Sequence, residues 1–386
     1  MPPQSSSTSS SEAEAAETVD APARTARPAW RSLARTAAWC AVVLVLFEVL
    51  TAVLFTRTRL ANGSLRKFLW YGVSYEQKVR ELVHTPNLPP RSILHAGWID
   101  PAAYRNQPSE PELTIYGMSF SNNTGEALKE LRPDMSVRMI GGPGAPLSHA
   151  YGAYLVDRPL RRTRFAMVGV TSGAVQEVLL MNRGSLFADA PFPYFFPRFE
   201  LVDGKIVKVA DSLINTSDEL RAAIDDPVLW GKQLDVLAAH DDGYRRFYFA
   251  SDWLDYSLLG RLVRRGLSKH HAQAYTTRIL GPNGFRRDHQ AVQLFRALLR
   301  QMVSDLRTEN VQPIVFLYAL QGQSNHLFDL VNDILRDDKI PYVNSFDLCR
   351  PDNLANYVPD MHFIPECDTA FAKRVLALMN EPERRP

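Results

Sequence analysis

Cysteine is scarce in this chain: there are three in 386 residues, Cys40, Cys349 and Cys367. The sequence has no CxxC motif and no cluster of cysteine with histidine, the patterns typical of structural zinc sites. We therefore expect no structural zinc, and the sequence predicts no other metal or cofactor.

An excess of one charge is also missing. The chain has 44 Lys and Arg residues against 42 Asp and Glu residues, so its formal net charge is +2. Proteins that bind nucleic acids concentrate positive charge to neutralise phosphates. The balance here predicts no nucleic-acid partner. Internal repeats are missing as well, so nothing indicates a repeat architecture.

The N-terminal 56 residues divide into a polar tail and a long apolar run. Residues 1–35 lack apolar periodicity and are rich in Ser, Ala, Glu and Pro, which predicts a disordered tail. Residues 36–56 are mostly apolar, and at 1.5 Å per residue they just cross a bilayer core of about 30 Å. No clear A-x-A-like cleavage site follows. We predict a single transmembrane anchor; the alternative is a buried helix of a soluble protein.

The charges around this run do not decide its orientation. Four arginines precede it and four basic residues follow it, so the positive-inside rule favours neither direction. Glu48 lies within the run and is either a contact to a partner helix or a tolerated charge. A short tail before a large C-terminal part favours an N-in signal anchor. This interpretation gives a single-pass cell-membrane protein with its C-terminal domain outside the cytoplasm.

An oxidising location would matter for two of the cysteines. Cys349 and Cys367 lie on either side of Asp360 and His362, so a disulfide there would close a loop around both residues. Two unrelated buried thiols are the alternative.

After a juxtamembrane region of helix and loop at 57–111, short apolar strands alternate with helical segments. This alternation predicts an α/β domain over 112–386 with a mostly parallel sheet flanked by helices. The expected strands are 113–116, 136–140, 164–170, 313–318 and 340–346. The expected helices are 126–131, 149–156, 174–181, 288–307 with Asp288 as N-cap, 327–336 and 368–380.

A large insertion at about 184–287 interrupts this alternation. Its segment 187–199 is aromatic and rich in proline, and is either a packed part of the insertion or a platform for sugars or lipids. Residues 199–210 predict a hairpin that turns at Asp203-Gly204. A basic stretch at 261–271 predicts a solvated helix face, with recognition of an anionic glycan or lipid headgroup as the alternative.

Residues with the chemistry of acyl transfer follow several of the predicted strands. In a parallel sheet the loops after the strands meet at one edge, so these residues should converge. A serine there can attack a carbonyl, while a histidine takes its proton and an aspartate orients the imidazole. The residues are Ser119, Gly142, Thr171 and Ser172, together with Asp360 and His362 of the last loop. Alternatively, Ser119 only caps a helix, and Asp360 and His362 are ordinary loop residues.

The blocks Gly117-Met118-Ser119, Gly142 and Asp360-Met361-His362 resemble those of the SGNH/GDSL hydrolase superfamily. The resemblance covers about 112–380 and implies a three-layer α/β/α fold. It implies Ser119 as nucleophile, His362 as base and Asp360 as its partner. Ser119 and Gly142 would be oxyanion donors. The chain is most similar to membrane-linked acetyltransferases of alginate and related cell-surface polysaccharides, which also tend to show Asp-x-His.

Two blocks depart from the family pattern. The first has Met118 where the family has aspartate, and the third has Thr171 and Ser172 where an asparagine donor is expected. A hydroxyl of Thr171 or Ser172 would then complete the oxyanion hole. Loss of one such donor costs about 10²–10³ in rate, so an inactive homologue is a real alternative.

The resemblance therefore implies a membrane-anchored, extracytoplasmic serine acyltransferase or esterase. Its substrate would be an O-acyl group, most simply O-acetyl, on a cell-surface or exported polysaccharide, and a membrane-bound acyl-donor protein would be a partner. The alternatives are a non-catalytic glycan-binding or docking component of an export complex, and a lipase-like esterase.

Overall fold

The computed structural model describes residues 28–57, 64–89 and 92–381. Helix α1, Pro28–Arg57, belongs to a first unit, and the chain from Thr58 onward forms a second. Within α1, the 24 residues Trp30–Val53 are long and apolar enough to cross a membrane. The helix begins at Pro28, ahead of the predicted span. Residues 1–27 of the predicted tail lie outside the described residues.

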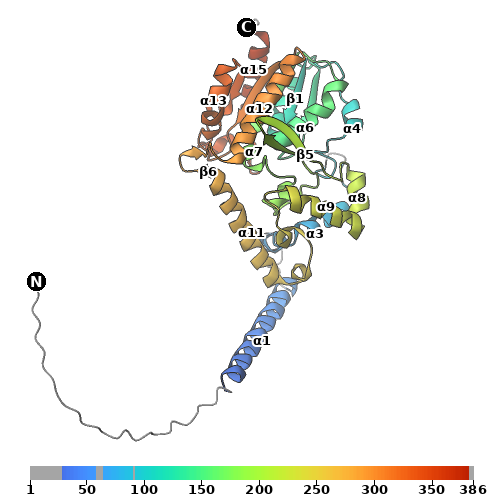
Figure 1. Cartoon of the computed structure of the whole chain (residues 1–386), viewed down its shortest axis with the longest axis vertical. Helices are drawn as coiled ribbons and strands as arrows, with labels where there is room; N and C mark the ends of the chain where they lie inside the picture. Colours follow the sequence, from blue (N-terminus) through green and yellow to red (C-terminus); the bar gives the residue numbers. More distant parts are fainter. Residues whose placement is uncertain (1–27, 58–63, 90–91, 382–386) are drawn as a thin grey trace, which may run out of the picture. The chain divides into compact units, whose positions relative to one another are not determined.

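Five strands of the second unit form one parallel sheet (Figure 1). They are β1 Leu113–Gly117, β2 Val137–Gly141, β3 Phe165–Thr171, β8 Gln312–Tyr318 and β9 Tyr342–Asn344. The order is β2-β1-β3-β8-β9, with every neighbouring pair parallel. The chain passes from β1 to one side for β2 and then crosses to β3 on the other side. This reversal creates a topological switch point between β1 and β3, where open sheets bind ligands.

Helices cover both faces of this sheet, as two contacts of β1 demonstrate. A Cβ atom at Gly125 of α5 would lie 2.9 Å from the side chain of Ile115. The next residue, Tyr116, donates a 2.7 Å hydrogen bond to Asp157 of α6. Successive strand residues point to opposite faces, so α5 and α6 lie on opposite sides. The flanking helices are α5 Ser119–Leu131, α6 Leu147–Asp157, α7 Ser172–Glu177, α12 Gln290–Thr308, α13 His326–Asp337, α14 Ser345–Leu348 and α15 Pro365–Asn380.

The predicted α/β class and parallel sheet are confirmed, but several element boundaries were wrong. Helix α7 ends at Glu177 rather than 181. Helix α5 begins at Ser119 rather than 126, because burial of its first turns outweighs the weak helix propensity of Ser and Asn. Helix α12 is capped by His289, whose Nδ1 accepts the Ala291 N–H at 3.1 Å, and not by Asp288. The fifth strand ends at Asn344, whose side chain caps α14.

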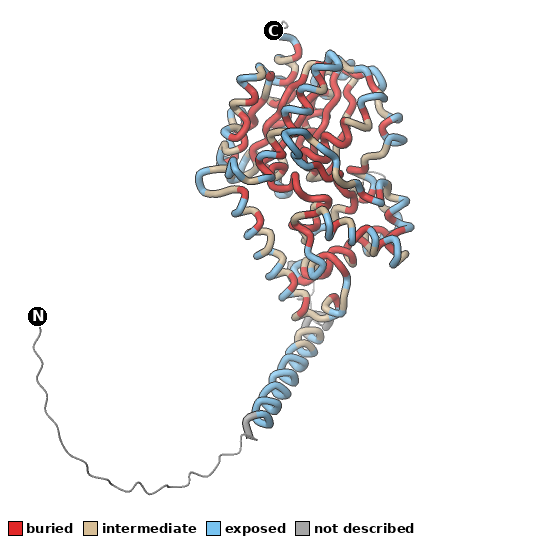
Figure 2. The backbone as a smooth tube through the Cα atoms, viewed as in Figure 1, coloured by how far each residue is buried: buried red, intermediate tan, exposed pale blue. Residues whose placement is uncertain are grey.

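A second apolar cluster, which we call the helical core, joins the predicted juxtamembrane region to the insertion (Figure 2). Tyr75 and Val79 of α3 pack there with Trp230, Leu234 and Phe249 of the insertion. Residues 75–89 and 92–98 are therefore an integral part of the folded domain. The other α-helices and strands of this unit are α2 Ser64–Trp70, α3 Tyr75–Val83, α4 Pro101–Arg105, β4 Arg198–Val202, β5 Lys205–Ala210, α8 Ser217–Ile224, α9 Pro227–His240, α10 Arg246–Phe249, α11 Leu258–Ile279, β6 Leu280–Gly281 and β7 Gly284–Phe285.

Several predictions for the insertion can now be judged. The hairpin at Asp203-Gly204 is confirmed, with positive φ at both turn residues. In the aromatic segment, Tyr194, Phe195, Phe196 and Phe199 are all buried, so these four rings pack internally and offer no open platform. The solvated-face interpretation of the basic stretch is wrong for Arg264, which is 2% exposed and pairs with Asp255 at 2.5 Å.

Cys349 and Cys367 form a disulfide, with their Cα atoms 6.0 Å apart. The bridge joins the end of α14 to the first turn of α15 and encloses the loop that carries Asp360 and His362. Cys40 of α1 is the free cysteine of the described residues.

Candidate active site

Ser119 is the first residue of α5, directly beyond the end of β1. Two glycines let the first turn of α5 settle on the sheet: a Cβ at Gly117 or Gly169 would come within 2.3 or 2.0 Å of Ser121 Oγ. Gly117 is the last residue of β1 and Gly169 lies in β3, so the first turn of α5 packs on both strands. Ser119 is thereby held at the switch point of the sheet.

His362 reaches Ser119 from a tight loop near the C-terminus. Its Nε2 lies 2.7 Å from Ser119 Oγ, across 243 residues of sequence. The loop is closed by two 2.9 Å backbone bonds, from Met361 N–H to Val358 O and from Val358 N–H to His362 O. Met361 occupies the left-handed region with φ of 71°, which turns the chain back toward α5. The Phe120 ring lies 4.7 Å from the imidazole and supports it.

Asp360 completes the predicted trio from the solvent side. Its Oδ1 lies 3.1 Å from His362 Nδ1 and accepts the His362 backbone N–H at 3.2 Å. The backbone hydrogen bond, followed by the contact with the His362 side chain, lowers the pKa of the Asp360 carboxyl, so it stays ionised. Its side chain is 70% exposed, so water screens its support of the imidazole. The arrangement can deprotonate Ser119 with His362 as base and Asp360 as orienter.

Gly142 directly follows β2, whose last residue Gly141 pairs with Gly117 of β1. This register brings Gly142 to the same edge of the sheet as Ser119. A Cβ at Gly142 would lie only 2.4 Å from the Cα of Gly97, so close packing explains why glycine is required here. Within the described residues no hydrogen bond joins Gly142 to Ser119, and the role of Gly142 as an oxyanion donor stays a prediction.

Thr171 and Ser172 lie at the end of β3 and the start of α7, as predicted, and both are buried. The Ser172 hydroxyl donates to Oε1 of Gln323, in the loop after β8. Its one proton is therefore used in this arrangement. Sequence analysis missed Gln323, although it too follows a predicted strand, and its amide NH₂ is a donor of the kind the third block lacks.

A buried ion pair near this edge was also missed. Glu177 of α7 is buried, and its Oε1 lies 3.5 Å from Arg183 Nε. Burial raises the pKa of Glu177, and Arg183 opposes this rise. The Arg183 guanidinium lies against Gly144, where a Cβ would overlap it. Arg183 therefore lies beside the loop that follows β2. No periodic pattern in the sequence marked either residue.

His149 of α6 does not belong to the predicted trio of Ser119, His362 and Asp360. It is fully buried, and its ring packs against Tyr194 and Phe196. Its Nε2 lies 2.7 Å from Gly97 O, and burial lowers its pKa to about 4. It is therefore neutral at pH 7.

This burial predicts acid sensitivity. As pH falls below about 6.5, His149 binds a proton in the unfolded chain. In the folded chain it binds a proton only near pH 4, so acid favours the unfolded chain. Stability should therefore fall by about 2 kcal/mol from this residue between pH 7 and 5. His149→Gln keeps a donor for Gly97 without the titration, so thermal scans should show a smaller acid-induced drop in Tm. An equal drop in both proteins would contradict the prediction.

Among the described residues, no group of three or more His, Cys, Asp or Glu side chains is placed to hold a metal ion. Comparison of the chain with protein-family models and with curated proteins found no match. The argument for function therefore depends on the fold and on this site.

Proposed function

We propose that the chain is a membrane-anchored, extracytoplasmic serine acyltransferase or esterase of the SGNH/GDSL type, with a three-layer α/β/α domain. The observation that carries the proposal is the 2.7 Å contact between Ser119 Oγ and His362 Nε2 at the switch point of the sheet. Two residues so far apart in sequence meet where parallel sheets bind ligands.

In the proposed reaction, Ser119 Oγ attacks the carbonyl carbon of an O-acetyl ester while His362 Nε2 takes the hydroxyl proton. The tetrahedral intermediate collapses, the sugar oxygen leaves with that proton, and the acetyl group stays on Ser119. A second hydroxyl, from water or from another sugar, then reverses these steps. Water gives an esterase and a sugar hydroxyl gives a transferase.

The oxyanion would be stabilised first by the start of α5. Met118 at the N-cap supplies no side-chain acceptor to this helix, so the Ser119 N–H can serve a developing negative charge. Gly142 N–H is the second proposed donor. The third is Gln323 or Ser172, because rotation of the Gln323 amide would place its NH₂ on Ser172 Oγ and release the Ser172 hydroxyl.

The proposed location draws support from two features. The apolar segment Trp30–Val53 suits an anchor, and the Cys349–Cys367 disulfide suits an oxidising compartment outside the cytoplasm. A cell-surface polysaccharide carrying O-acetyl esters is an acyl substrate available there, and a membrane-bound donor protein would supply acyl groups for transfer.

Covalent labelling tests the proposal. A fluorophosphonate probe should label the full chain in detergent or nanodiscs, with Ser119 as the modified residue by peptide mass spectrometry. His362→Gln should reduce the labelling rate strongly, while Ser109→Ala, a change at an exposed serine, should not affect it. Folded protein that takes no label would overturn the proposed mechanism.

The second candidate is a non-catalytic glycan-binding or docking module of the same fold. The observation that favours it is the hydrogen bond that engages Ser172 at the expected position of the third donor. Absence of labelling together with retained glycan binding would select it. A lipase-like activity would appear as preference for long-chain over acetyl esters.

A further inference from the structure

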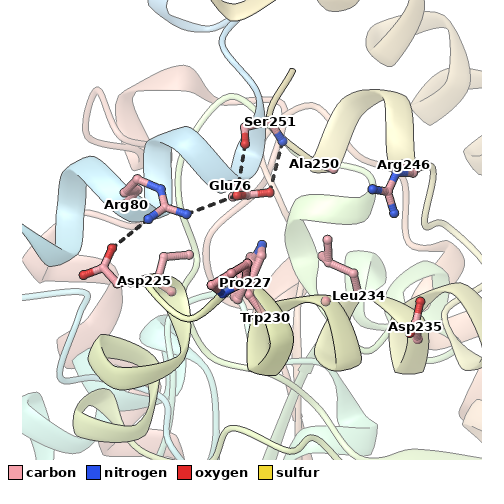
Figure 3. Close-up of a pocket in the computed structure, with 12 residues that line it drawn as sticks. Glu76, Arg80, Asp225, Pro227, Trp230, Leu234, Asp235, Arg246, Ala250 and Ser251 are labelled. Atoms are coloured by element: carbon pink, nitrogen blue, oxygen red, sulfur yellow. Dashed lines mark hydrogen bonds and ion pairs between the residues drawn. The ribbon is translucent and has the colours of Figure 1, made fainter. Parts of the chain in front are cut away.

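The helical core contains a pocket that the catalytic residues do not share (Figure 3). It lies between α3, the junction of α8 with α9, and residues 246–251. No strand of the sheet and no residue of the 357–363 loop lines it. Its volume is about 350 Å³, at the lower end of the range of about 300–1,000 Å³ typical of small-molecule sites.

One wall of this pocket is a fixed chain of hydrogen bonds. Glu76 of α3 accepts the Ser251 N–H and hydroxyl, both at 3.0 Å, and pairs with Arg80 at 3.2 Å. Arg80 also binds Asp225 at 2.7 Å. Figure 3 shows these bonds running from Asp225 at the left through Arg80 and Glu76 to Ser251 at the top. Their mutual bonds hold them in place before a ligand arrives, which lowers the entropic cost of binding.

The opposite wall is apolar and contains one unsatisfied donor. Pro227, Trp230 and Leu234 come from α9, and Trp230 is only 4% exposed. Its indole N–H is buried and has no hydrogen-bond partner among the described residues. Figure 3 shows the Trp230 side chain pointing from α9 toward Glu76 and Ala250. An unpaired buried donor is costly, so a ligand oxygen that accepted this N–H would be favoured.

The far end of the pocket presents one acid and one base. Asp235 of α9 and Arg246 of α10 are both exposed, and neither has an ion pair within the described part of the chain. Counting Glu76, Asp225 and Asp235 against Arg80 and Arg246, the lining carries three formal negative and two positive charges. This balance disfavours a phosphate or carboxylate ligand. Separate acceptors and donors around an apolar wall match a ligand with many hydroxyl groups.

We propose that this pocket binds a neutral sugar unit. The apolar wall would contact the C–H face of the ring, while Asp235 and Arg246 would bind its hydroxyls and Trp230 N–H would donate to an oxygen. Resting on the proposed function, the pocket would hold a segment of the polysaccharide whose ester groups reach Ser119. It would raise affinity for the polymer without entering the chemistry.

Saturation-transfer NMR with the full chain in nanodiscs tests the pocket directly. The probes are neutral manno-, cello- and galacto-oligosaccharides, with galacturonate and inorganic phosphate as anionic comparisons. At least one neutral oligosaccharide should bind, and Asp235→Asn with Arg246→Gln should weaken that binding about tenfold or more. Trp230→Phe, which removes the N–H and keeps most of the ring, should weaken it by a similar factor.

The matched control is Asp218→Asn with Arg221→Gln, an exposed pair on α8 outside the pocket with the same change of charge. It should leave binding unchanged. Binding that is unaffected by the pocket variants, binding of the anions alone, or no binding of any neutral sugar would overturn the inference. The pocket variants should cleave a small chromogenic acetate at the wild-type rate, so a failure of the Ser119 chemistry is seen separately.

Discussion

Ser119→Ala is expected to lower the turnover of an O-acetyl ester by about 10⁴–10⁶-fold, because the acyl-enzyme can no longer form. His362→Gln should cost a similar factor, since the base 2.7 Å from Ser119 Oγ is lost. The double variant should be no slower than either single variant, because the two residues act as one unit. Initial rates on a chromogenic acetate and on an acetylated glycan measure all three.

Asp360→Asn should cost far less, about tenfold. A buried aspartate in a serine triad contributes more, but the Asp360 side chain is 70% exposed and its interaction with the imidazole is screened. Ser109→Ala, with circular dichroism to confirm folding, is the control for surface substitution. Retention of full activity by Ser119→Ala would refute the mechanism outright. A loss from Asp360→Asn as large as that from His362→Gln would mean that the carboxylate is less screened than its exposure indicates.

The contact between Ser119 and His362 could be predicted from the sequence because the ends of parallel strands fix where the following loops lie. The apolar runs of β1, β2, β3 and β8 mark buried parallel strands, and such strands bring the loops that follow them to one edge. This prediction required only that each of these strands be recognised as buried. The same logic placed Gly142, Thr171 and Ser172 correctly by element, although not by hydrogen-bond partner.

Gln323 and Arg264 escaped prediction because their roles depend on partners from distant segments. Gln323 stands in a polar loop, and only the position of Ser172 gives it significance. Arg264 belongs to a basic stretch that looks solvated, yet it is buried in an ion pair with Asp255. Residues 75–89 and 92–98 were predicted only as part of a juxtamembrane region for a related reason: the insertion that covers their apolar side chains lies far away in the sequence.

Removal of the disulfide is the second change with a large expected effect. Replacing Cys349 and Cys367 by serine should lower the free energy of unfolding by about 3 kcal/mol, because the bridge spans 18 residues and restricts the unfolded chain. In a domain of this size, Tm should fall by about 4–5 °C. Cys40→Ser, at the free cysteine of α1, is the matched control and should leave Tm unchanged.

Activity below the lowered Tm should nevertheless stay near the wild-type rate. The loop that carries His362 has its own attachments: Tyr357 pairs with Phe363, and the Tyr357 hydroxyl donates to Ala319 O at 3.0 Å. The Phe363 ring also packs 4.9 Å from Phe371 of α15. Together with the Phe120 ring against the imidazole, these contacts hold His362 beside Ser119 without the sulfur bridge. A fall in kcat at unchanged Tm would contradict this prediction. It would mean that the disulfide is the element that positions His362.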